Sequence, residues 1–430
     1  MKWGALILKS GSNFKQKNGA WILIILGWLV YATSYLGKVN YSANITQIID
    51  FYGVNKTEAG TVPTFFFFAY GIGQVLNGLL CKKYNIKWMI FGSLTISATI
   101  NLLVGLTSDF FIIKWLWLIN GIVLSVLWPT LVRLLSETMP VKLLGTSSVV
   151  MGTTVAVGTM VAYGLSSIYA AFDNFKLSFY TASIAIFTVS IVWLLLYNKS
   201  VEISKKEQEN ELDVDKSKIN SSVKQNPQKG DKRIFLTSIY ILCFYSVGVN
   251  LIKDGLITWV PAILKEEFFM KDSLSILLTL FLPVLAIFGN AVALQMHKII
   301  PDYVNHCAII FVITSVLIGS IIGSLTLKTV VCVIIGLVAV SFLISSLNSL
   351  ITSVFPLFMR GKVNSGLFAG ILNGFAYLGS TISAYGLGVV ADNFGWITVF
   401  WLLIGFCIIS LIVWGVYSVI NAFVKKKPNT

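Results

Sequence analysis

The sequence predicts an all-α membrane protein whose twelve transmembrane helices form two pseudo-symmetric six-helix halves. The 430 residues are 56% hydrophobic and only 12% charged, which is too apolar for a soluble globular protein. Apolar runs of the roughly 20 residues that a membrane-crossing helix needs recur along the chain. One polar segment divides these runs into two groups of six. Composition, run length and this division together predict the fold class.

Short polar connections separate the predicted spans. In the first half they read "YGVNKTE", "CKKYNIK", "TSD", "SETMPVK" and "FDNFK", and in the second half "KEEFFMKD", "HKIIPDYVNH", "TLK", "FMRGKVNS" and "ADNFGW". Each contains charged or turn-forming residues that end an apolar run. The predicted spans are 20–49, 58–80, 88–107, 112–134, 146–168, 177–197, 234–264, 273–296, 306–326, 329–350, 363–389 and 397–421.

The segments outside the spans are short, apart from one. Residues 1–19 form a predicted N-terminal tail whose apolar patch is flanked by lysines without a small-residue cleavage site, so we expect the first span to be retained. Residues 425–430 form a predicted C-terminal tail. Residues 199–233 are rich in Lys, Glu, Asp, Ser and Asn, which predicts a solvated linker. The halves are then residues 20–198 and 234–424, arranged as two parallel repeats.

The distribution of positive charge predicts the orientation in the membrane. The formal net charge is +14, from 32 Lys and Arg against 18 Asp and Glu. If the N-terminus is cytoplasmic, the outer connections and their helix ends hold few of the lysines: Lys56, Lys114, Lys176, Lys265, Lys271 and Lys328. Nearly all the others lie inside, as the positive-inside rule requires. We therefore expect a multi-pass protein of the cell membrane whose tails and linker are cytoplasmic. Its positive net charge reflects this orientation, and we expect no nucleic acid partner.

Two lysines lie at matching depths in the two halves. Lys38 lies about eighteen residues into the first span and Lys253 about nineteen residues into the seventh, roughly one turn beyond each helix midpoint. A lysine near the centre of a membrane helix costs about 2.5 to 3.5 kcal/mol on insertion. Both side chains are therefore expected to face protein or water. The alternative is that Lys38 snorkels to the outer interface and that Asp254 neutralises Lys253.

Polar and aromatic side chains accompany each lysine at helical spacing. Around Lys253 the stripe is short and contains Ser246 and Asn250. Adjacent residues point about 100° apart, so we do not expect Lys253 and Asp254 to share a helix face easily. Two lysines and one aspartate leave a net charge of +1, which favours an anionic substrate. The alternative interpretation is that Asp254 carries a proton during transport. The stripe around Lys38 is continuous, which indicates a cavity lining: Tyr31, Ser34, Tyr35, Tyr41 and Ser42.

The eleventh span carries two features of its own. Gly366, Gly370 and Gly374 recur every fourth residue, a spacing that predicts close helix packing. Asn373, Tyr377 and Ser380 lie at i, i+4 and i+7 and are predicted to line the same cavity. A plain interhelical hydrogen bond is an equal interpretation of Asn373.

Several classes of site are not expected. The five cysteines are scattered and show no CxxC spacing, which predicts neither a disulfide nor a metal site. The polar segments contain no phosphate-binding glycine loop, HExxH or GxSxG pattern. We therefore expect no enzymatic activity, metal or cofactor, and a transport process would depend on gradients.

Four stretches resemble a known family: "WLVYATSYLGKVNYS", "WPTLVRLLSETMPVKLLGTSS", "IKDGLITWVPAILKE" and "GLFAGILNGFAYLGS" followed by "VADNFGW". The chain resembles the major facilitator superfamily, and within it the organophosphate:phosphate antiporters. In that family two arginines, from the first and seventh helices, clamp the phosphate. The matching positions here are Lys38 and Lys253. Gln74 and Val155 stand where glycerol-phosphate transporters have a lysine and a histidine, and Lys82 stands where an acidic residue is expected.

The resemblance implies a monomeric secondary transporter that moves a small organic anion, a phosphorylated metabolite in exchange for phosphate, by alternating access. Lys38 and Lys253 would bind the anionic group. The rest of the pocket would be shaped by Tyr31, Tyr35, Tyr41, Asn250, Asn373 and Tyr377. Two alternatives stay open. One is a proton-coupled symporter of carboxylates or sugars that uses Asp254, and the other is a non-transporting membrane sensor related to hexose-phosphate carriers.

Overall fold

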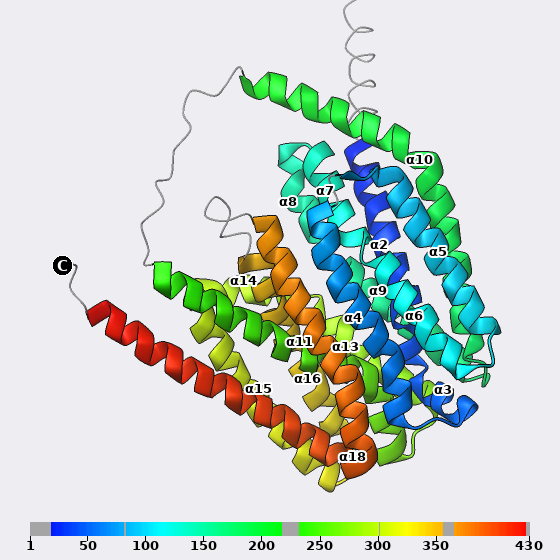
Figure 1. The fold of residues 1–430 in the computed structure, drawn as a ribbon, viewed down its shortest axis with the longest axis vertical. Helices are drawn as coiled ribbons and strands as arrows, with labels where there is room; N and C mark the ends of the chain where they lie inside the picture. Colours follow the sequence, from blue (N-terminus) through cyan, green and yellow to red (C-terminus); the bar gives the residue numbers. More distant parts are fainter. Residues whose placement is uncertain (1–18, 81–82, 217–231, 301, 356–364, 427–430) are drawn as a thin grey trace, which may run out of the picture.

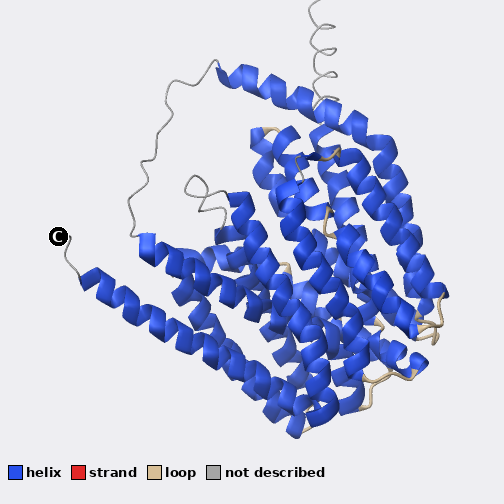
Figure 2. Cartoon of the chain, viewed as in Figure 1, coloured by secondary structure: helices blue, strands red, loops and turns tan. Residues whose placement is uncertain are grey.

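The computed structural model describes residues 19–80, 83–216, 232–300, 302–355 and 365–426, and the described secondary structure is entirely helical (Figure 2). The N-terminal half comprises helices α2 to α10 and the C-terminal half helices α11 to α18, and the two halves lie side by side (Figure 1). Their interface is built by α4 against α18, by α9 against α12 and α13, and by α11 against α3 and α2.

The N-terminal half contains both continuous and broken helices. Asn85 and Asp109 cap the starts of α5 and α6, because their side chains accept hydrogen bonds from backbone N–H groups of the first turn. The helices are α2 (Gly19–Ala43), α3 (Ile45–Tyr52), α4 (Lys56–Leu80), α5 (Ile86–Leu106), α6 (Phe110–Leu124), α7 (Leu127–Thr138), α8 (Val141–Gly152), α9 (Thr154–Ala170) and α10 (Lys176–Lys216).

The C-terminal half follows the same order with more interruptions. Asp302 caps the start of α15, and a π-helical turn, η2, ends the tenth crossing. The elements are α11 (Lys232–Phe268), α12 (Asp272–Thr279), α13 (Phe281–Ala286), α14 (Gly289–Ile299), α15 (Tyr303–Thr326), α16 (Val330–Ser349), η2 (Leu350–Val354) and α18 (Ser365–Lys426).

The described helices account for twelve membrane crossings, which confirms the fold class. Ten stretches are long and apolar enough to cross a membrane. The last of them, within α18, is two helices joined across Gly395, whose φ of 78° and ψ of 170° are not helical. Glycine tolerates this positive φ because it has no Cβ. The eighth crossing consists of α12, α13 and α14, which are too short individually.

Two boundaries differ from the sequence prediction. The first predicted span, 20–49, breaks at Asn44, whose amide donates to the carbonyl of Asn40 and to Ser166. The predicted linker starts at residue 199, but α10 continues through Lys216. Ser204, inside that segment, is fully buried and donates to the carbonyl oxygen of Thr138. Contacts with α7 and helical charge pairs support a helix over residues 199–216, and the role of residues 199–233 as the linker between the halves stays a prediction.

The close approach of α4 and α18 depends on Gly60 and Gly388, and on one member of the predicted ladder, Gly374. A Cβ on Gly60 would lie 2.4 Å from the carbonyl oxygen of Ala384, and one on Gly388 would lie 2.8 Å from that of Lys56. In the ladder, Gly374 approaches Val75, whereas Gly370 faces open space. Gly366 lies outside the residues whose side-chain environment is described.

We expect Gly60→Ala to destabilise the protein, because its methyl group would force the α4 and α18 backbones apart. Overpacking of this kind typically costs about 1 to 3 kcal/mol. Thermal unfolding of the purified protein in detergent would measure the change. Gly370→Ala is the matched control, since its Cβ would meet nothing within 4 Å. Equal melting temperatures for the two variants would contradict this account of the interface.

Candidate functional site

Lys38, on α2, points into the interior of the bundle. Its ammonium donates to the hydroxyl oxygen of Tyr377 on α18, with a Nζ to O distance of 3.2 Å. It also lies 4.2 Å from the ring centroid of Tyr70, 4.8 Å from that of Tyr35 and 5.7 Å from that of Phe66. Lys38 therefore does not snorkel, and its contacts join the N-terminal half to α18.

The aromatic rings around Lys38 form a connected cluster, which we call the tyrosine cage. The Tyr70 and Tyr377 ring centroids lie 4.6 Å apart. The Tyr31 and Tyr70 hydroxyl oxygens lie 3.5 Å apart. An ammonium over an aromatic face is stabilised by about 0.5 to 2 kcal/mol, more when it is desolvated. The cage therefore holds the Lys38 ammonium without a carboxylate. Its members are Tyr31, Tyr35, Phe66, Tyr70 and Tyr377.

Lys253, on α11, is held by two neighbours on its own helix. Its ammonium donates to Asn250 Oδ1 at 2.9 Å and forms an ion pair with Asp254 Oδ1 at 3.4 Å. The sequence predicted that Lys253 and Asp254 would not easily share a helix face, yet their side chains form an ion pair. The 100° between adjacent residues describes the Cα to Cβ directions, and the flexible four-carbon stem of lysine bridges it.

Asn250 and Asp254 are in turn fixed by other helices. The Asn250 amide nitrogen donates to Asn348 Oδ1 at 3.0 Å and to the carbonyl of Ser246, which leaves its own oxygen for Lys253. The second oxygen of Asp254 accepts a hydrogen bond from Ser380 on α18. Lys253 therefore sits in a polar network that belongs to the C-terminal half.

The two lysines lie in one electrostatic neighbourhood. Lys38 contacts Tyr377 on α18, and Asp254, which pairs with Lys253, accepts a hydrogen bond from Ser380, three residues further along the same helix. Lys38 and Lys253 are partly exposed although they lie near the middle of the bundle, so each borders space that water can reach. Each half thus contributes one lysine whose contacts lead to the same stretch of α18.

One predicted pocket residue, Tyr41, is not part of this neighbourhood, and the place of a second, Asn373, in the pocket stays a prediction. Tyr41 is buried within the N-terminal half, where its hydroxyl donates to the carbonyl of Ala59 and its ring lies 5.8 Å from that of Trp117. The prediction for Tyr41 placed it on the wrong side of α2. Asn373 is partly exposed and makes no hydrogen bond to a described residue.

Sequence reasoning missed the contribution of α4. Phe66 and Tyr70 face Lys38, and the side-chain amide of Gln74 donates to the Tyr70 hydroxyl at 3.1 Å. These residues are spaced by four, which places them on one helix face. That spacing was readable, but the surrounding run "FFFFAY" concealed it because every position there is apolar or aromatic.

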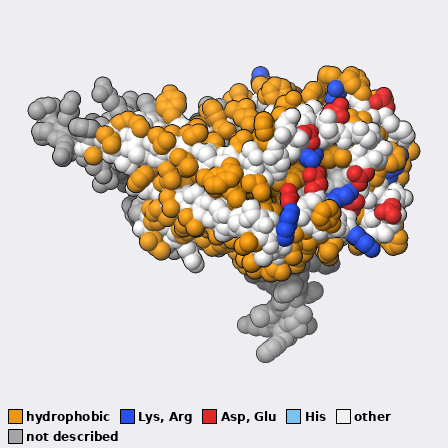
Figure 3. Space-filling view, turned by 90° about the horizontal axis from the view of Figure 1, so that it is seen from below, with side chains coloured by type: hydrophobic (Ala, Val, Ile, Leu, Met, Phe, Trp, Pro, Cys, Tyr) orange, Lys and Arg blue, Asp and Glu red, His pale blue; other side chains and the backbone are white. Residues whose placement is uncertain are grey.

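Charged side chains join the two halves at the end of the bundle that carries α3, which we call the α3 end. Lys56 on α4 pairs with Glu266 at 3.1 Å and with Asp392 at 3.5 Å. Lys265 pairs with Asp50 on α3. Seen from below, this face is covered by protein, with the charged groups gathered to one side (Figure 3). The seam is therefore closed at the α3 end.

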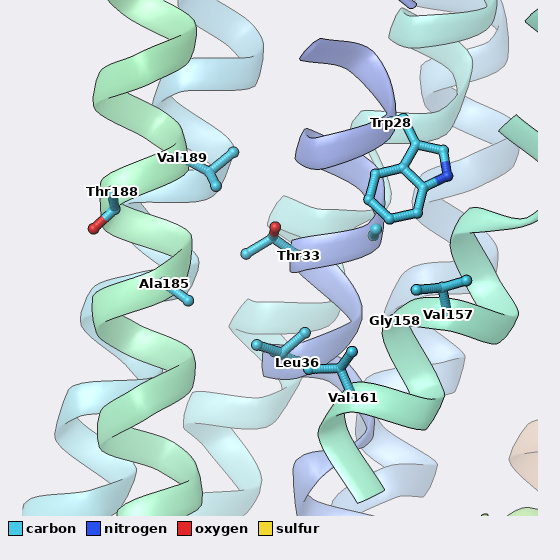
Figure 4. A pocket seen from close by; sticks show the side chains of 10 residues that line it. Trp28, Thr33, Leu36, Val157, Gly158, Val161, Ala185, Thr188 and Val189 are labelled. Atoms are coloured by element: carbon cyan, nitrogen blue, oxygen red, sulfur yellow. The ribbon is translucent and has the colours of Figure 1, made fainter. Parts of the chain in front are cut away.

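A separate apolar groove lies between α2, α9 and α10. Its volume is about 370 Å³, and Trp28, Leu36, Val161 and Val189 are among its lining residues (Figure 4). None of the lining residues is charged, and neither lysine of the site is among them. It is not the place where an anion would bind.

Twelve crossings in two halves, with a polar seam between them, define a polytopic membrane protein of the transporter class. Residues 27–369 match the Major Facilitator Superfamily, and the chain belongs to that family. Among solved structures, it is similar to a bacterial homolog of the human lysosomal transporter Spinster in an inward-facing and occupied conformation. The TM-score is 0.76 at 11% identity, over 96% of this chain and 99% of that one.

Two curated relatives share low sequence identity with most of the chain, and a third matches a shorter part of it. Sugar phosphate exchanger 3 of Homo sapiens is 23% identical, over 80% of this chain and 76% of its own length. The glycerol-3-phosphate transporter of Bacillus subtilis is 24% identical, over 89% of this chain and 88% of its own. The membrane sensor protein UhpC of Escherichia coli is 22% identical over 99 residues, or 23% of each chain.

Proposed function

We propose that this protein is a secondary transporter that exchanges a phosphorylated metabolite for inorganic phosphate. The observation that carries the proposal is that each half brings one lysine to the same stretch of α18: Lys38 contacts Tyr377, and Asp254, the ion-pair partner of Lys253, contacts Ser380. Lysine binds phosphate as a compact point charge. Relatives named for sugar phosphates and glycerol 3-phosphate support this choice of substrate class.

Each residue of the site has a role in this proposal. Lys38 and Lys253 contact the phosphoryl oxygens, and Asn250 orients Lys253. Tyr31, Tyr35, Tyr70 and Tyr377 present hydroxyls and ring faces to the remainder of the substrate, and Asn373 lines the same chamber. Because Lys38 binds Tyr377 on the opposite half, a phosphate that takes its N–H donors would weaken one contact that joins the halves.

Alternating access is supported by the closure at the α3 end, because a carrier must be able to close its seam on one side. We further propose that both tails and the linker are cytoplasmic, that the α3 end faces outward in the cell membrane, and that the protein works as a monomer. The short outer connections and the distribution of lysines support this orientation.

Counterflow in proteoliposomes tests the proposal. Vesicles that contain the purified protein and are loaded with phosphate should take up labelled glucose 6-phosphate much faster than vesicles loaded with phosphate-free buffer. Exchange should be insensitive to collapse of a pH gradient by an uncoupler. Uptake that requires the pH gradient and is lost in Asp254→Asn would instead support proton symport of another substrate.

A sensor is the second candidate, favoured by the similarity to UhpC over 99 residues. The two functions separate cleanly in the same preparation. Saturable binding of glucose 6-phosphate with no flux above that of protein-free vesicles would identify a sensor, whereas flux excludes a purely sensory protein.

A further inference from the structure

The two lysines of the site differ in how their charges are compensated. Lys253 has its own counter-ion, the Asp254 carboxylate at 3.4 Å. Lys38 interacts with a hydroxyl and aromatic rings, and no described carboxylate lies within ion-pair distance of it. The site therefore holds one compensated and one uncompensated cation. With two lysines and one aspartate the site has a net charge of +1, whereas a clamp of two lysines without a carboxylate would have a net charge of +2.

The groups that face Asp254 come from four helices. Lys253 lies on the same helix, α11, and Ser380 donates to the carboxylate from α18. Within electrostatic range lie Lys38 on α2 and three tyrosines, whose hydroxyls are neutral donors and acceptors: Tyr35 on α2, Tyr163 on α9 and Tyr377 on α18. The fixed charges around the site are thus two positive and one negative.

An uncompensated charge inside the membrane is costly, so the occupied site should approach neutrality. On the basis of the function proposed above, we propose that the site accepts one net negative charge, so that a phosphate monoester binds together with one proton, and that Asp254 sets this limit. The second ionisation of a phosphate monoester has a pKa of about 6. At pH 7 most of the free ester is a dianion and must gain a proton on binding, either on the phosphate or on Asp254.

Proton counting tests the proposal directly. Calorimetric titration of the full-length protein in detergent, in buffers with different ionisation enthalpies, measures the protons taken up per bound ligand. For glucose 6-phosphate at pH 7 we expect about one proton. For glucose 6-sulfate, which is a fixed monoanion, we expect none. Proton uptake with the sulfate would place the proton on the protein irrespective of ligand charge and would overturn the proposal, as would the absence of uptake with the phosphate.

The dependence of affinity on pH gives a second measurement. The monoanion fraction of the ester falls about ten-fold between pH 5 and pH 7, so the Kd for glucose 6-phosphate should rise about ten-fold over that range while the Kd for the sulfate stays constant. In Asp254→Asn the Kd for the phosphate should not rise and proton uptake should disappear, whereas Asp254→Glu should behave as wild type. An Asp254→Asn protein with wild-type proton uptake would contradict the role of Asp254.

Failure of the proposed function would look different. If the wild-type protein binds neither ester, the site is not an organic-anion site, and both proposals fall together. If it binds both esters without proton uptake, only the neutral-site proposal falls. If Asp254→Asn cannot be purified in a folded form, the proton count of the wild-type protein decides alone.

Discussion

Lys38→Gln is expected to reduce the exchange of glucose 6-phosphate for phosphate about 100-fold. The substitution removes the one cation of the site that has no described carboxylate partner. A hydrogen bond to a charged group contributes about 1.5 to 3 kcal/mol, and 2.7 kcal/mol corresponds to about 100-fold in affinity. Initial rates of counterflow at a substrate concentration well below saturation would measure the loss.

Two further variants show whether the loss comes from charge. Lys38→Arg retains the charge and the donors, so we expect it to keep a substantial fraction of the exchange rate. Lys83→Gln removes an exposed lysine at the opposite end from α3 and should leave exchange unchanged. Lys253→Gln should also be severely impaired, because it leaves the Asp254 carboxylate uncompensated beside the anion. Wild-type exchange in both Lys38→Gln and Lys253→Gln would reject the phosphate clamp.

Hydropathy alone predicted all twelve crossings, because the thickness of the bilayer dictates the length of an apolar run. It did not predict that α6 and α7, or α8 and α9, are separate helices, because a break within an apolar run leaves composition unchanged. The extension of α10 was concealed by charge. Its residues read as a solvated linker, yet Glu202 and Lys206 pair at i and i+4, and Ser204 is buried against Thr138.

The site was predictable in part for a similar reason. The depth of an ionisable residue in a helix follows from residue counting, so Lys38 and Lys253 could be recognised as equivalent positions in the two halves. Which face of a helix borders the seam is harder to predict when the helix is buried on several sides. Tyr41 shows this, since α2 carries polar groups toward both the seam and the interior of the N-terminal half. The contribution of Tyr70 depends on helix packing, which periodicity does not report.

Lys56→Gln is expected to shift the protein toward a conformation that is open at the α3 end. Lys56 is the common partner of Glu266 and Asp392, so its loss leaves two carboxylates of the C-terminal half without their cation from α4. Partly exposed ion pairs contribute up to about 1 kcal/mol each. A loss of about 1 kcal/mol corresponds to roughly a five-fold rise in the population of the open conformation.

Cysteine accessibility measures this shift. Thr258 is buried at the seam, with its hydroxyl oxygen 3.5 Å from that of Ser42 in the other half. In a cysteine-free background, Thr258→Cys should react slowly with a membrane-impermeant maleimide that reaches the α3 end. Adding Lys56→Gln should raise the labelling rate about five-fold, because labelling follows the open population when opening is fast.

Lys328→Gln provides the matched control, because Lys328 pairs with Glu267 at the same end but within the C-terminal half. It removes the same charge from the same face without breaking a contact between the halves, so its labelling rate should equal that of the parent. If both variants label alike, the shift comes from the general charge of the surface, and the Lys56 pairs do not hold the halves together. A selective effect of Lys56→Gln would mean that these ion pairs must break each time the seam opens toward the α3 end.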